Sequence, residues 1–519
     1  MLKKDFIQRT KLLLGDEFDI FAAALETEPP VSIRINPCKS DPFQLNAEGR
    51  LLLAQMEKIP WCTTGYYLPQ RPSFTYDPLF HAGAYYVQEA SSMFLEQAVL
   101  TILADPRMSK SGIKALDLCA APGGKSTHLL TLLPNDSLLV SNEIIRNRSL
   151  ILAENIAKWG NANVIITQND PKDFGYIPHF FDVIVADLPC SGEGLFRKYP
   201  EAANEWSIEQ VKLCASRQRR IIRDVWRTLK PGGYLIYSTC TFNAEENEDN
   251  IEALSEELGA EILPIPINTH WNISDARCLC PVADLAAAQF SNPRAYMTPE
   301  RDLAAAHRIS LPPVYRFFPH RTRGEGFFLA LLRKKNDAFE GLASQRNTPF
   351  EGGRNFSSQV KSSLRLFDPS TPAKESQIKN MLSTPEKFVF RYDNPKYKET
   401  GIRNMLTAIP VIHESAYATL SRYLKIIAVG LPLGETKGKD FIPSAWLALS
   451  TELNIHSFPS IELTYKQAIS YLKKELIDLP PKTPKGHLLV NYQHIPLGFV
   501  KNTETRANNM FPREWRIRR

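Results

Sequence analysis

Two cysteines that could do covalent chemistry lie directly after two apolar segments of the chain. Cys190 lies in ADLPCSG, residues 186–192, and Cys240 lies in STCT, residues 238–241. A cysteine can be a nucleophile, a metal ligand or a small buried apolar group, so the residue type alone leaves three possibilities. Asp187 lies in the same segment as Cys190, and a carboxylate beside a thiol can add acid–base chemistry to nucleophilic attack.

These segments belong to an alternation of strands and helices that runs from about residue 113 to residue 240. The helix-forming segments KSTHLLTLL, RNRSLILAENIAKWG and SIEQVKLCASRQRRIIRDVWRTL lie between apolar segments. This spacing predicts an α/β fold with a doubly wound, Rossmann-like parallel sheet. The predicted strands are residues 113–120, 137–143, 163–170, 181–189 and 233–241, with a further strand at 326–334.

Acids and thiols stand at the ends of all five successive strands. Ligands of such sheets bind beyond the carboxyl ends of the strands, and core packing alone would not gather these residue types there. The sequence therefore predicts one site at this edge of the sheet. The strand-end residues are, in chain order, the CAAPGGKS turn, Glu143, Asp170, Asp187 with Cys190, and Cys240.

The turn after the first strand, CAAPGGKST, matches a phosphate-binding loop only at its end. Gly124-Lys125-Ser126 fits the last three positions of the Walker A motif, but Cys119 stands where that motif needs a glycine. Pro122 also removes a backbone N–H from any phosphate cradle. We therefore expect a turn whose backbone approaches a ligand that carries no triphosphate. The predicted cofactor-binding residues of this turn are Cys119, Ala120, Ala121, Pro122, Gly123, Gly124 and Lys125.

Two acids after the turn indicate which cofactor it would bind. Glu143 lies 19 residues after Gly124, where a carboxylate can accept two ribose hydroxyls. Asp170 could meet an adenine amino group. Together they describe an adenosine cofactor without pyrophosphate, which S-adenosylmethionine fits better than NAD. No metal is expected, because Cys278 and Cys280 form a C-x-C with no second pair or nearby histidine.

A methyl donor, a thiol and an aspartate together suit one difficult reaction. Carbon 5 of cytosine is a poor nucleophile, but a thiolate that adds to carbon 6 makes carbon 5 enamine-like and able to attack a methyl sulfonium. An acid near ring nitrogen 3 takes up the developing charge, and a base then removes the carbon 5 proton so that the thiol can leave. The target base must be single-stranded or flipped out to reach such a site.

The segments ALDLCAAPGGKSTHL, DVIVADLPCSGEG and GYLIYSTCTFNAEENE resemble the signature segments of the Sun/Nop-type RNA cytosine-5 methyltransferases. VSIRINPCK, YYVQEASSM and RFFPHRTRGEGFFLALLRK are similar to that family's N-terminal RNA-binding segment, the stretch leading into its catalytic domain, and its closing segment. This resemblance covers about residues 30 to 335. Beyond it, GLPLGETKGKDFIPSAWLALS and VNYQHIPLGFVKN resemble the PUA-like C-terminal extension of the bacterial small-subunit rRNA methyltransferase F type.

The resemblance implies a role for each of these positions. Residues 119–125 would wrap the methionine part of S-adenosylmethionine, Glu143 would hold its ribose, and Asp170 would lie on its adenine side. Asp187 would lie at the boundary between cofactor and base. Cys240 would be the catalytic nucleophile that attacks carbon 6.

Cys190, in the resemblance, would assist release of the methylated base. Position 188 is Leu where the family usually has Ala, which adds bulk beside the base pocket. The implied reaction is methylation of cytosine carbon 5 in structured RNA, with small-subunit (16S) ribosomal RNA or the small ribosomal subunit as the partner. Two alternatives stay open: a tRNA cytosine-5 methyltransferase, and a catalytically inactive RNA-binding factor of ribosome assembly.

The chain is expected to divide into four parts. Residues 1–84 would be a small N-terminal RNA-binding domain, 85–335 the methyltransferase domain, 336–375 a linker, and 376–519 an α+β PUA-like RNA-binding domain. The linker is expected because its stretch is polar and contains Ser, Gly, Asn and Pro. Residues 264–314, which show no clear periodicity, are expected to be an insertion.

Composition narrows the partners and the compartment. The 519 residues carry a net charge of +6, and the basic residues cluster in 217–230 and 501–519, which favours a nucleic-acid partner. No apolar run approaches the length of a membrane span. The eight cysteines come without an export signal, so reduced thiols and a cytoplasmic, monomeric protein are expected.

Overall fold

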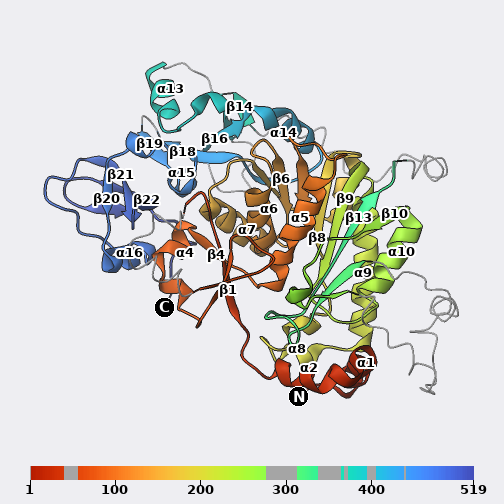
Figure 1. The fold of residues 1–519 in the computed structure, drawn as a ribbon. Coiled ribbons are helices and arrows are strands. Elements are labelled where there is room, and N and C mark those ends of the chain that lie inside the picture. The colour runs from red at the N-terminus through yellow and green to blue at the C-terminus, as the bar shows by residue number, and fades with distance from the viewer. Residues whose placement is uncertain are drawn as a thin grey trace.

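The computed structural model describes residues 2–39, 56–275, 313–336, 364–366, 372–393, 405–437 and 440–518. Most of the expected insertion (276–312, with Cys278 and Cys280) and most of the expected linker (337–363 and 367–371) lie outside the described residues. A large mixed sheet covered by helices forms the centre of the molecule, and the C-terminal sheets lie beside it (Figure 1).

The central sheet confirms the predicted α/β fold. Its strands β5, β6, β7, β8 and β9 are parallel and lie in the spatial order β9-β8-β5-β6-β7. The strand order reverses at β5, which is where open α/β sheets bind their ligands. The bounds are β5 (Lys114–Asp117), β6 (Leu138–Asn142), β7 (Val164–Thr167), β8 (Phe181–Asp187) and β9 (Leu229–Thr239).

Antiparallel strands extend the sheet on the β9 side. The predicted strand at 326–334 is β13, which pairs with β9. It continues the sheet through β12 to β11, while β10 also pairs with β13. The bounds are β10 (Ala260–Leu263), β11 (Ser274–Asp275), β12 (Val314–Phe317) and β13 (Phe327–Lys334).

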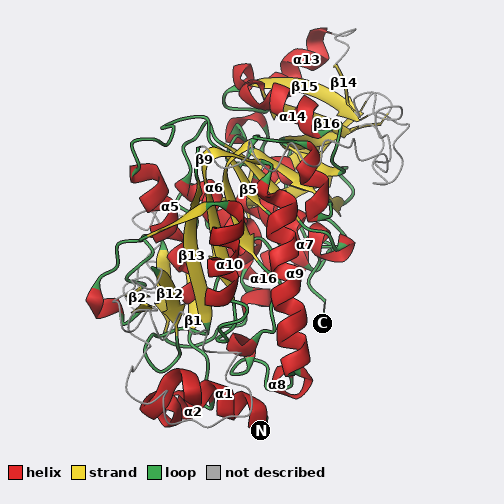
Figure 2. Cartoon of the chain, turned by 90° about the vertical axis from the view of Figure 1, so that its right-hand side faces the viewer, coloured by secondary structure: helices red, strands yellow, loops and turns green. Residues whose placement is uncertain are grey.

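Helices cover both faces of the central sheet, because the strands are apolar on both sides (Figure 2). In β8, Val183 and Val185 belong to one hydrophobic core, while Ile184 and Ala186 belong to the other. Helices α5, α6 and α7 contribute to the first core, and α9 and α10 to the second. None of the described helices has the length and apolarity needed to cross a membrane. The bounds are α5 (Leu95–Ala104), α6 (Gly124–Leu132), α7 (Arg146–Trp159), α9 (Ile208–Trp226) and α10 (Glu248–Leu258).

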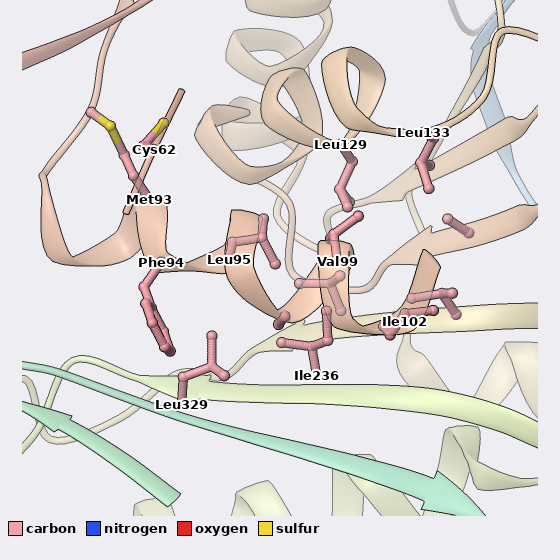
Figure 3. Packing of buried hydrophobic residues seen from close by; sticks show 14 of the residues in the cluster. Cys62, Met93, Phe94, Leu95, Val99, Ile102, Leu129, Leu133, Ile236 and Leu329 are labelled. Atoms are coloured by element: carbon pink, nitrogen blue, oxygen red, sulfur yellow. The ribbon is translucent and has the colours of Figure 1, made fainter. Parts of the chain in front are cut away.

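The first core holds α5 against the strands that lead to the predicted site. Figure 3 shows Val99 and Ile102 of α5 near Ile236 of β9, with Leu329 of β13 beside them. All four side chains are at most 2% exposed. Burial of one such side chain contributes about 1.5–3 kcal/mol. This packing therefore fixes the position of β9 relative to α5, and with it the position of the loop that follows β9.

The N-terminal residues form a helical pair and a four-stranded sheet of order β2-β3-β1-β4. Strand β4 pairs with β1, so this sheet continues three residues past the predicted boundary at residue 84. Phe6 of α1 packs edge-on against Phe196, and Phe21 of α2 against Phe242, which places the helices on loops that follow strands of the central sheet. The bounds are α1 (Lys4–Leu14), α2 (Phe18–Leu25), β1 (Val31–Ile35), β2 (Glu57–Lys58), β3 (Gly65–Leu68) and β4 (Tyr85–Val87).

The C-terminal residues form two further sheets, of order β14-β15-β16-β18-β19 and β20-β21-β22-β23. One strand of this part, β17 (Ile426–Val429), belongs instead to the central sheet, where it pairs antiparallel with β7 at the edge. The bounds are β14 (Leu364–Leu366), β15 (Phe388–Asp393), β16 (Met405–Pro410), β18 (Leu431–Lys437), β19 (Asp440–Pro443), β20 (Ser460–Glu462), β21 (Gly486–Tyr492), β22 (Ile495–Asn502) and β23 (Ala507–Asn509).

Candidate active site

The structure brings the two predicted thiols together at the carboxyl ends of β8 and β9. These strands are parallel neighbours in which Asp187 pairs with Ser238, so the loops that follow them lie side by side. The Sγ atoms of Cys190 and Cys240 are 3.1 Å apart, and the Cys240 backbone N–H donates to the Cys190 Sγ at 3.4 Å. Both residues are half-buried. A single reacting group could therefore meet both thiols.

Their contact makes the two thiols chemically unequal. The hydrogen bond with Cys240 and burial both raise the pKa of Cys190 well above its usual value. Cys190 is therefore a neutral thiol at pH 7, which is a poor nucleophile but can donate a proton.

Asp187 forms an ion pair with a lysine from the first turn. Its Oδ2 lies 2.8 Å from the Lys125 Nζ, and its Oδ1 accepts a hydrogen bond from the Ser238 hydroxyl at 2.8 Å. Burial opposes the charged form of Lys125, but Asp187, Asp117 and Cys240 together raise the lysine pKa. The sequence interpretation gave more weight to the backbone of this turn than to the charge of Lys125, whereas the structure places a buried ammonium group beside the thiols.

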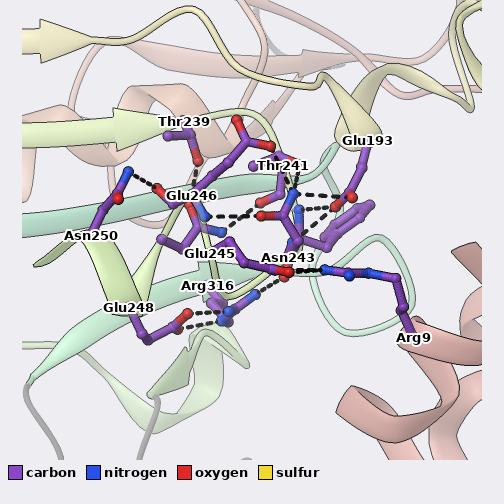
Figure 4. Close-up of polar contacts among 12 residues, drawn as sticks. Arg9, Glu193, Thr239, Thr241, Asn243, Glu245, Glu246, Glu248, Asn250 and Arg316 are labelled. Carbon is purple, nitrogen blue, oxygen red and sulfur yellow. Dashed lines mark hydrogen bonds and ion pairs between the residues drawn. The ribbon is translucent and has the colours of Figure 1, made fainter. Parts of the chain in front are cut away.

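A buried polar network lies behind the two cysteine loops (Figure 4). Asn243 is its centre: its Nδ2 donates to the Thr241 Oγ1, the Glu193 Oε1 and the Glu246 Oε1 at 2.8–3.1 Å. The Asn243 Oδ1 accepts the Glu246 backbone N–H at 2.9 Å. Glu246 also accepts the backbone N–H of Ser191 at 3.0 Å. The network therefore ties the residue after Cys190 to the residue after Cys240.

Further contacts brace the same loops from outside. Glu193 accepts the backbone N–H groups of Phe242 and Asn243, each at 2.8 Å, and the indole N–H of Trp206 at 3.0 Å. Arg316 pairs with Glu248. These residues were not singled out from the sequence as site residues. Their contacts span up to 74 residues of chain, so local spacing carried no signal for them.

The glycine turn lies at the carboxyl end of β5, as predicted. Gly123 adopts φ 118° directly before α6, a backbone conformation that glycine accepts without strain. A side chain there would meet Leu152 of α7 at 3.3 Å. The turn is thus narrow, and its backbone is accessible to a ligand. Burial and nearby carboxylates raise the pKa of Cys119 far above its usual value, so its thiol stays neutral.

Asp117, at the end of β5, is a buried acid that the sequence analysis did not propose for the site. Its Oδ2 accepts the Ser126 hydroxyl at 2.6 Å, while its Oδ1 has no hydrogen-bond partner among the described residues. Burial raises the pKa of Asp117 to about 7. A buried carboxylate oxygen without a donor is costly, and it suits a site in which a ligand or water supplies that donor. In the sequence, the acid near the end of the predicted strand in ALDLC could have indicated Asp117 as a site residue.

Glu143 and Asp170 lie at the ends of β6 and β7, as predicted. Glu143 is only 3% exposed; its Oε1 accepts the Ile145 backbone N–H at 2.9 Å and its Oε2 lies 3.3 Å from Arg148. Arg148 also donates to the Ala121 carbonyl at 2.8 Å, which links Glu143 to the glycine turn. Asp170 is half-buried and accepts the Lys172 backbone N–H at 3.1 Å. Both carboxylates keep acceptor positions for a ligand.

One cluster elsewhere has metal-ligand residue types: Cys62, Glu96 and His128, all buried. The His128 Nε2 lies 3.1 Å from the Glu96 Oε2 and 3.7 Å from the Cys62 Sγ. Buried Arg34 lies close enough to interact electrostatically with Glu96 and His128, and it already balances the one carboxylate. A divalent cation would add uncompensated charge, so the cluster fits a hydrogen-bonded core better than a metal centre.

Comparisons with known proteins match all three parts of the chain. The family model of the 16S rRNA methyltransferase RsmB/F matches residues 103–333. The models of the N-terminal domain of 16S rRNA methyltransferase RsmF and of the methyltransferase RsmF PUA domain match residues 2–90 and 458–517. The solved structure of PH0851 superposes with a TM-score of 0.50 at 25% identity, over 64% of this chain and 66% of that one.

Curated relatives match over nearly the whole length. Ribosomal RNA small subunit methyltransferase F of Aliivibrio fischeri (strain MJ11) is 33% identical over 508 residues, covering 96% of this chain and 93% of the relative. The protein of the same name from Escherichia coli O139:H28 is 31% identical over 508 residues, covering 96% and 92%. The chain therefore belongs to the ribosomal RNA small subunit methyltransferase F family.

Proposed function

We propose that this protein methylates carbon 5 of a cytosine in 16S ribosomal RNA, through a covalent adduct between Cys240 and carbon 6 of the base. The observation that carries the proposal is the pair of thiols 3.1 Å apart at the ends of β8 and β9, beside the Lys125–Asp187 ion pair. Membership of the family supports dependence on S-adenosylmethionine and RNA as substrate.

The residues of the first three strand ends fit the cofactor. Residues 119–125 would hold its methionine part through the narrow turn, Glu143 its ribose and Asp170 its adenine side. The open Oδ1 of Asp117 is a further acceptor, suited to a donor from the bound ligand or from an ordered water. When bound, S-adenosylmethionine supplies the electrophilic methyl group.

The chain's own residues would divide the reaction as follows. The Cys240 thiolate forms a bond to carbon 6, and the electron pair of the carbon 5–carbon 6 double bond moves toward ring nitrogen 3. The Lys125–Asp187 pair would supply a cation and a carboxylate to that side of the base, where it could stabilise or protonate the developing charge. Carbon 5 then gains the methyl group.

Release requires loss of the carbon 5 proton and cleavage of the bond between Cys240 and carbon 6. Cys190 lies in contact with the attacking sulfur, and its raised pKa keeps it protonated. It can position a water that accepts the carbon 5 proton, while the carbon 5–carbon 6 double bond re-forms and Cys240 leaves as a thiolate. Two thiols in contact therefore have distinct uses in one active site.

The decisive experiment is transfer of a labelled methyl group to purified small ribosomal subunits, naked 16S rRNA and tRNA in parallel, followed by mapping of 5-methylcytosine. We expect label in 16S rRNA as 5-methylcytosine. Label in tRNA alone would replace the rRNA assignment with the tRNA alternative. If calorimetry detected no cofactor binding and no RNA received the methyl group, the result would instead support an inactive assembly factor.

We also propose that the protein acts as a monomer in the cytoplasm. All of the candidate catalytic and cofactor-binding residues come from one chain, so the site needs no second copy. Sedimentation of the purified protein at a mass near 58.7 kDa is the expected result, and a dimer mass at micromolar concentration would contradict it.

A further inference from the structure

Helix α9 presents a basic outer face along its whole length. Its 19 residues bury one side against the sheet, and the opposite side is exposed. Viewed along the helix axis, four exposed basic residues lie on that side within half of the circumference. We name them the α9 ridge: Lys212, Arg217, Arg220 and Arg227.

The ridge residues differ from their neighbours in making no close acidic contact among the described residues. Arg223 pairs with Glu257 at 2.6 Å, and Arg219 donates to Asn250. Within the described part of the chain, none of the four ridge residues forms an ion pair within 4 Å. Between residues 212 and 227 the only acid is Asp224, which is half-buried. Arg220 interacts electrostatically with Asp224, and Lys212 with Glu209, so the fold offsets the positive charge of the ridge only in part.

The middle of the ridge lies level with the Cys190 loop. Gln218, on the buried side of α9, donates to the Pro189 carbonyl at 3.1 Å and to the Glu246 carboxylate at 2.8 Å. These contacts hold the middle of α9 against the Cys190 loop and the polar network behind it. From Lys212 to Arg227 the ridge spans about 22 Å, a length over which several phosphates of a nucleic-acid chain can lie.

The neighbouring helix limits the direction of approach. Helix α10 packs beside α9 and exposes Glu256 and Glu257 on its outer surface. Glu257 is offset by its pair with Arg223, but the Glu256 carboxylate repels a phosphate chain, so the electrostatic field favours a path along α9 and disfavours one across α10. Figure 2 shows the two helices on the same side of the sheet.

We propose that the α9 ridge binds the phosphates of the RNA strand that flanks the target cytosine. The inference rests on the proposed function for its substrate, and it adds the surface that guides that substrate to Cys240. Lysine and arginine contacts to phosphate release counterions, so the ridge should contribute a salt-dependent, sequence-independent part of RNA affinity. It leaves the recognition of the base itself to the pocket.

The test measures binding of in vitro transcribed 16S rRNA to the full chain over a KCl titration. Changing all four ridge residues to Gln should weaken binding at low salt. It should also make the plot of log K against log salt less steep by about 0.7 to 0.9 per lost phosphate contact. The matched control is K212R with R217K, R220K and R227K, which keeps every charge and should retain most of the wild-type slope.

Three further measurements distinguish a loss of phosphate contacts from misfolding and from the loss of a protein partner. S-adenosylmethionine affinity should be unchanged in both variants, because the ridge lies on the outer side of α9. If the four-Gln variant misfolds, R220Q and R227Q alone should each reduce the slope by about 0.7 to 0.9. Equal slopes for wild type and Gln variants would overturn the inference. So would a loss of affinity for whole small subunits but not for naked rRNA, which would assign the ridge to a protein partner.

Binding is measured without methyl transfer, so the two proposals fail separately. A protein that binds RNA through the ridge yet methylates no cytosine would contradict the proposed function alone. A protein that methylates 16S rRNA with an unchanged salt slope in the Gln variant would contradict the ridge alone.

Discussion

Replacing Asn243 by Ala should loosen both cysteine loops while leaving the cofactor turn intact. Asn243 is 7% exposed and bonds Thr241, Glu193 and Glu246. Alanine removes the donor to two carboxylates and leaves the Glu246 backbone N–H without its acceptor. The cysteine loops then lose the bridge that holds the two sulfur atoms in contact.

The magnitude follows from these bonds. Lost hydrogen bonds to a charged carboxylate cost about 1.5–3 kcal/mol, and an orphaned buried N–H costs about 1–3 kcal/mol. Glu193 and Glu246 keep other donors from Phe242 and Ser191, which reduces the total. We expect the free energy of local opening to fall by about 3 kcal/mol, or roughly 100-fold faster amide exchange in these loops.

The assay is hydrogen exchange of peptides covering residues 238–250 in the full chain, together with methyl transfer and cofactor binding. The turnover number should fall, while the cofactor dissociation constant should stay within about twofold, because no network bond reaches the glycine turn. The control is Asn204→Ala, an exposed position where the cost should be below about 0.5 kcal/mol.

A second variant separates lost bonds from lost volume. Asn243→Asp keeps the shape but adds a carboxylate between Glu193 and Glu246, so burial and like charges would raise its pKa in the folded protein. A carboxyl group with a raised folded pKa stabilises the fold at low pH and loses that contribution as pH rises. N243D should therefore be less stable at pH 8 than at pH 5 relative to wild type. Exchange and turnover unchanged in both variants would refute the network's role.

Three other perturbations test the remaining assignments. Glu143→Ala should weaken S-adenosylmethionine binding by about 1.5–3 kcal/mol, the value of hydrogen bonds to a charged group; an unchanged dissociation constant would remove Glu143 from the cofactor site. Cys240→Ala should abolish methylation and adduct formation, whereas Cys190→Ala should accumulate a covalent protein–RNA complex on denaturing gels when cofactor is present; the reverse pattern would exchange their roles. Deletion of residues 376–519 should weaken RNA binding in a salt-dependent manner. Because the deletion removes β17 and uncovers β7, it should also lower cofactor affinity and solubility. Normal cofactor affinity in a soluble truncated protein would show that β17 is dispensable.

The sheet and the meeting of the two thiols could be predicted because parallel strands bring their carboxyl ends to one edge. Strand-end residues such as Glu143, Asp187 and Cys240 are therefore readable from local pattern alone. Their specific roles stay predictions, since spacing places a residue without showing what it binds. The four-part division of the chain also stays a prediction, because most of the expected linker lies outside the described residues.

The polar network could not be predicted, because its residues look ordinary in sequence. Acids and amides in FNAEENE are typical of an exposed loop, yet Glu246 and Asn243 are at most 7% exposed. They become buried only because the Cys190 loop, some 50 residues earlier, supplies a donor for Glu246 and an acceptor for Asn243. The Lys125–Asp187 pair likewise joins two strand ends whose partnership depends on the strand order, which single-sequence patterns do not determine.

Strand β17 is a further feature that the sequence pattern did not predict. It gives the C-terminal part of the chain a structural role in the central sheet. The short segment IIAV lies in the C-terminal part of the chain, ahead of residues 458–517 that match the PUA family model, yet it completes the edge of the methyltransferase sheet. The Lys425 backbone N–H donates to the Asn169 Oδ1 at 3.0 Å, directly before Asp170. A change in how the C-terminal part binds RNA can therefore reach the predicted adenine side of the cofactor site through one strand. By linkage, any such coupling must act equally in both directions, so cofactor binding and RNA binding by this part of the chain are best measured together.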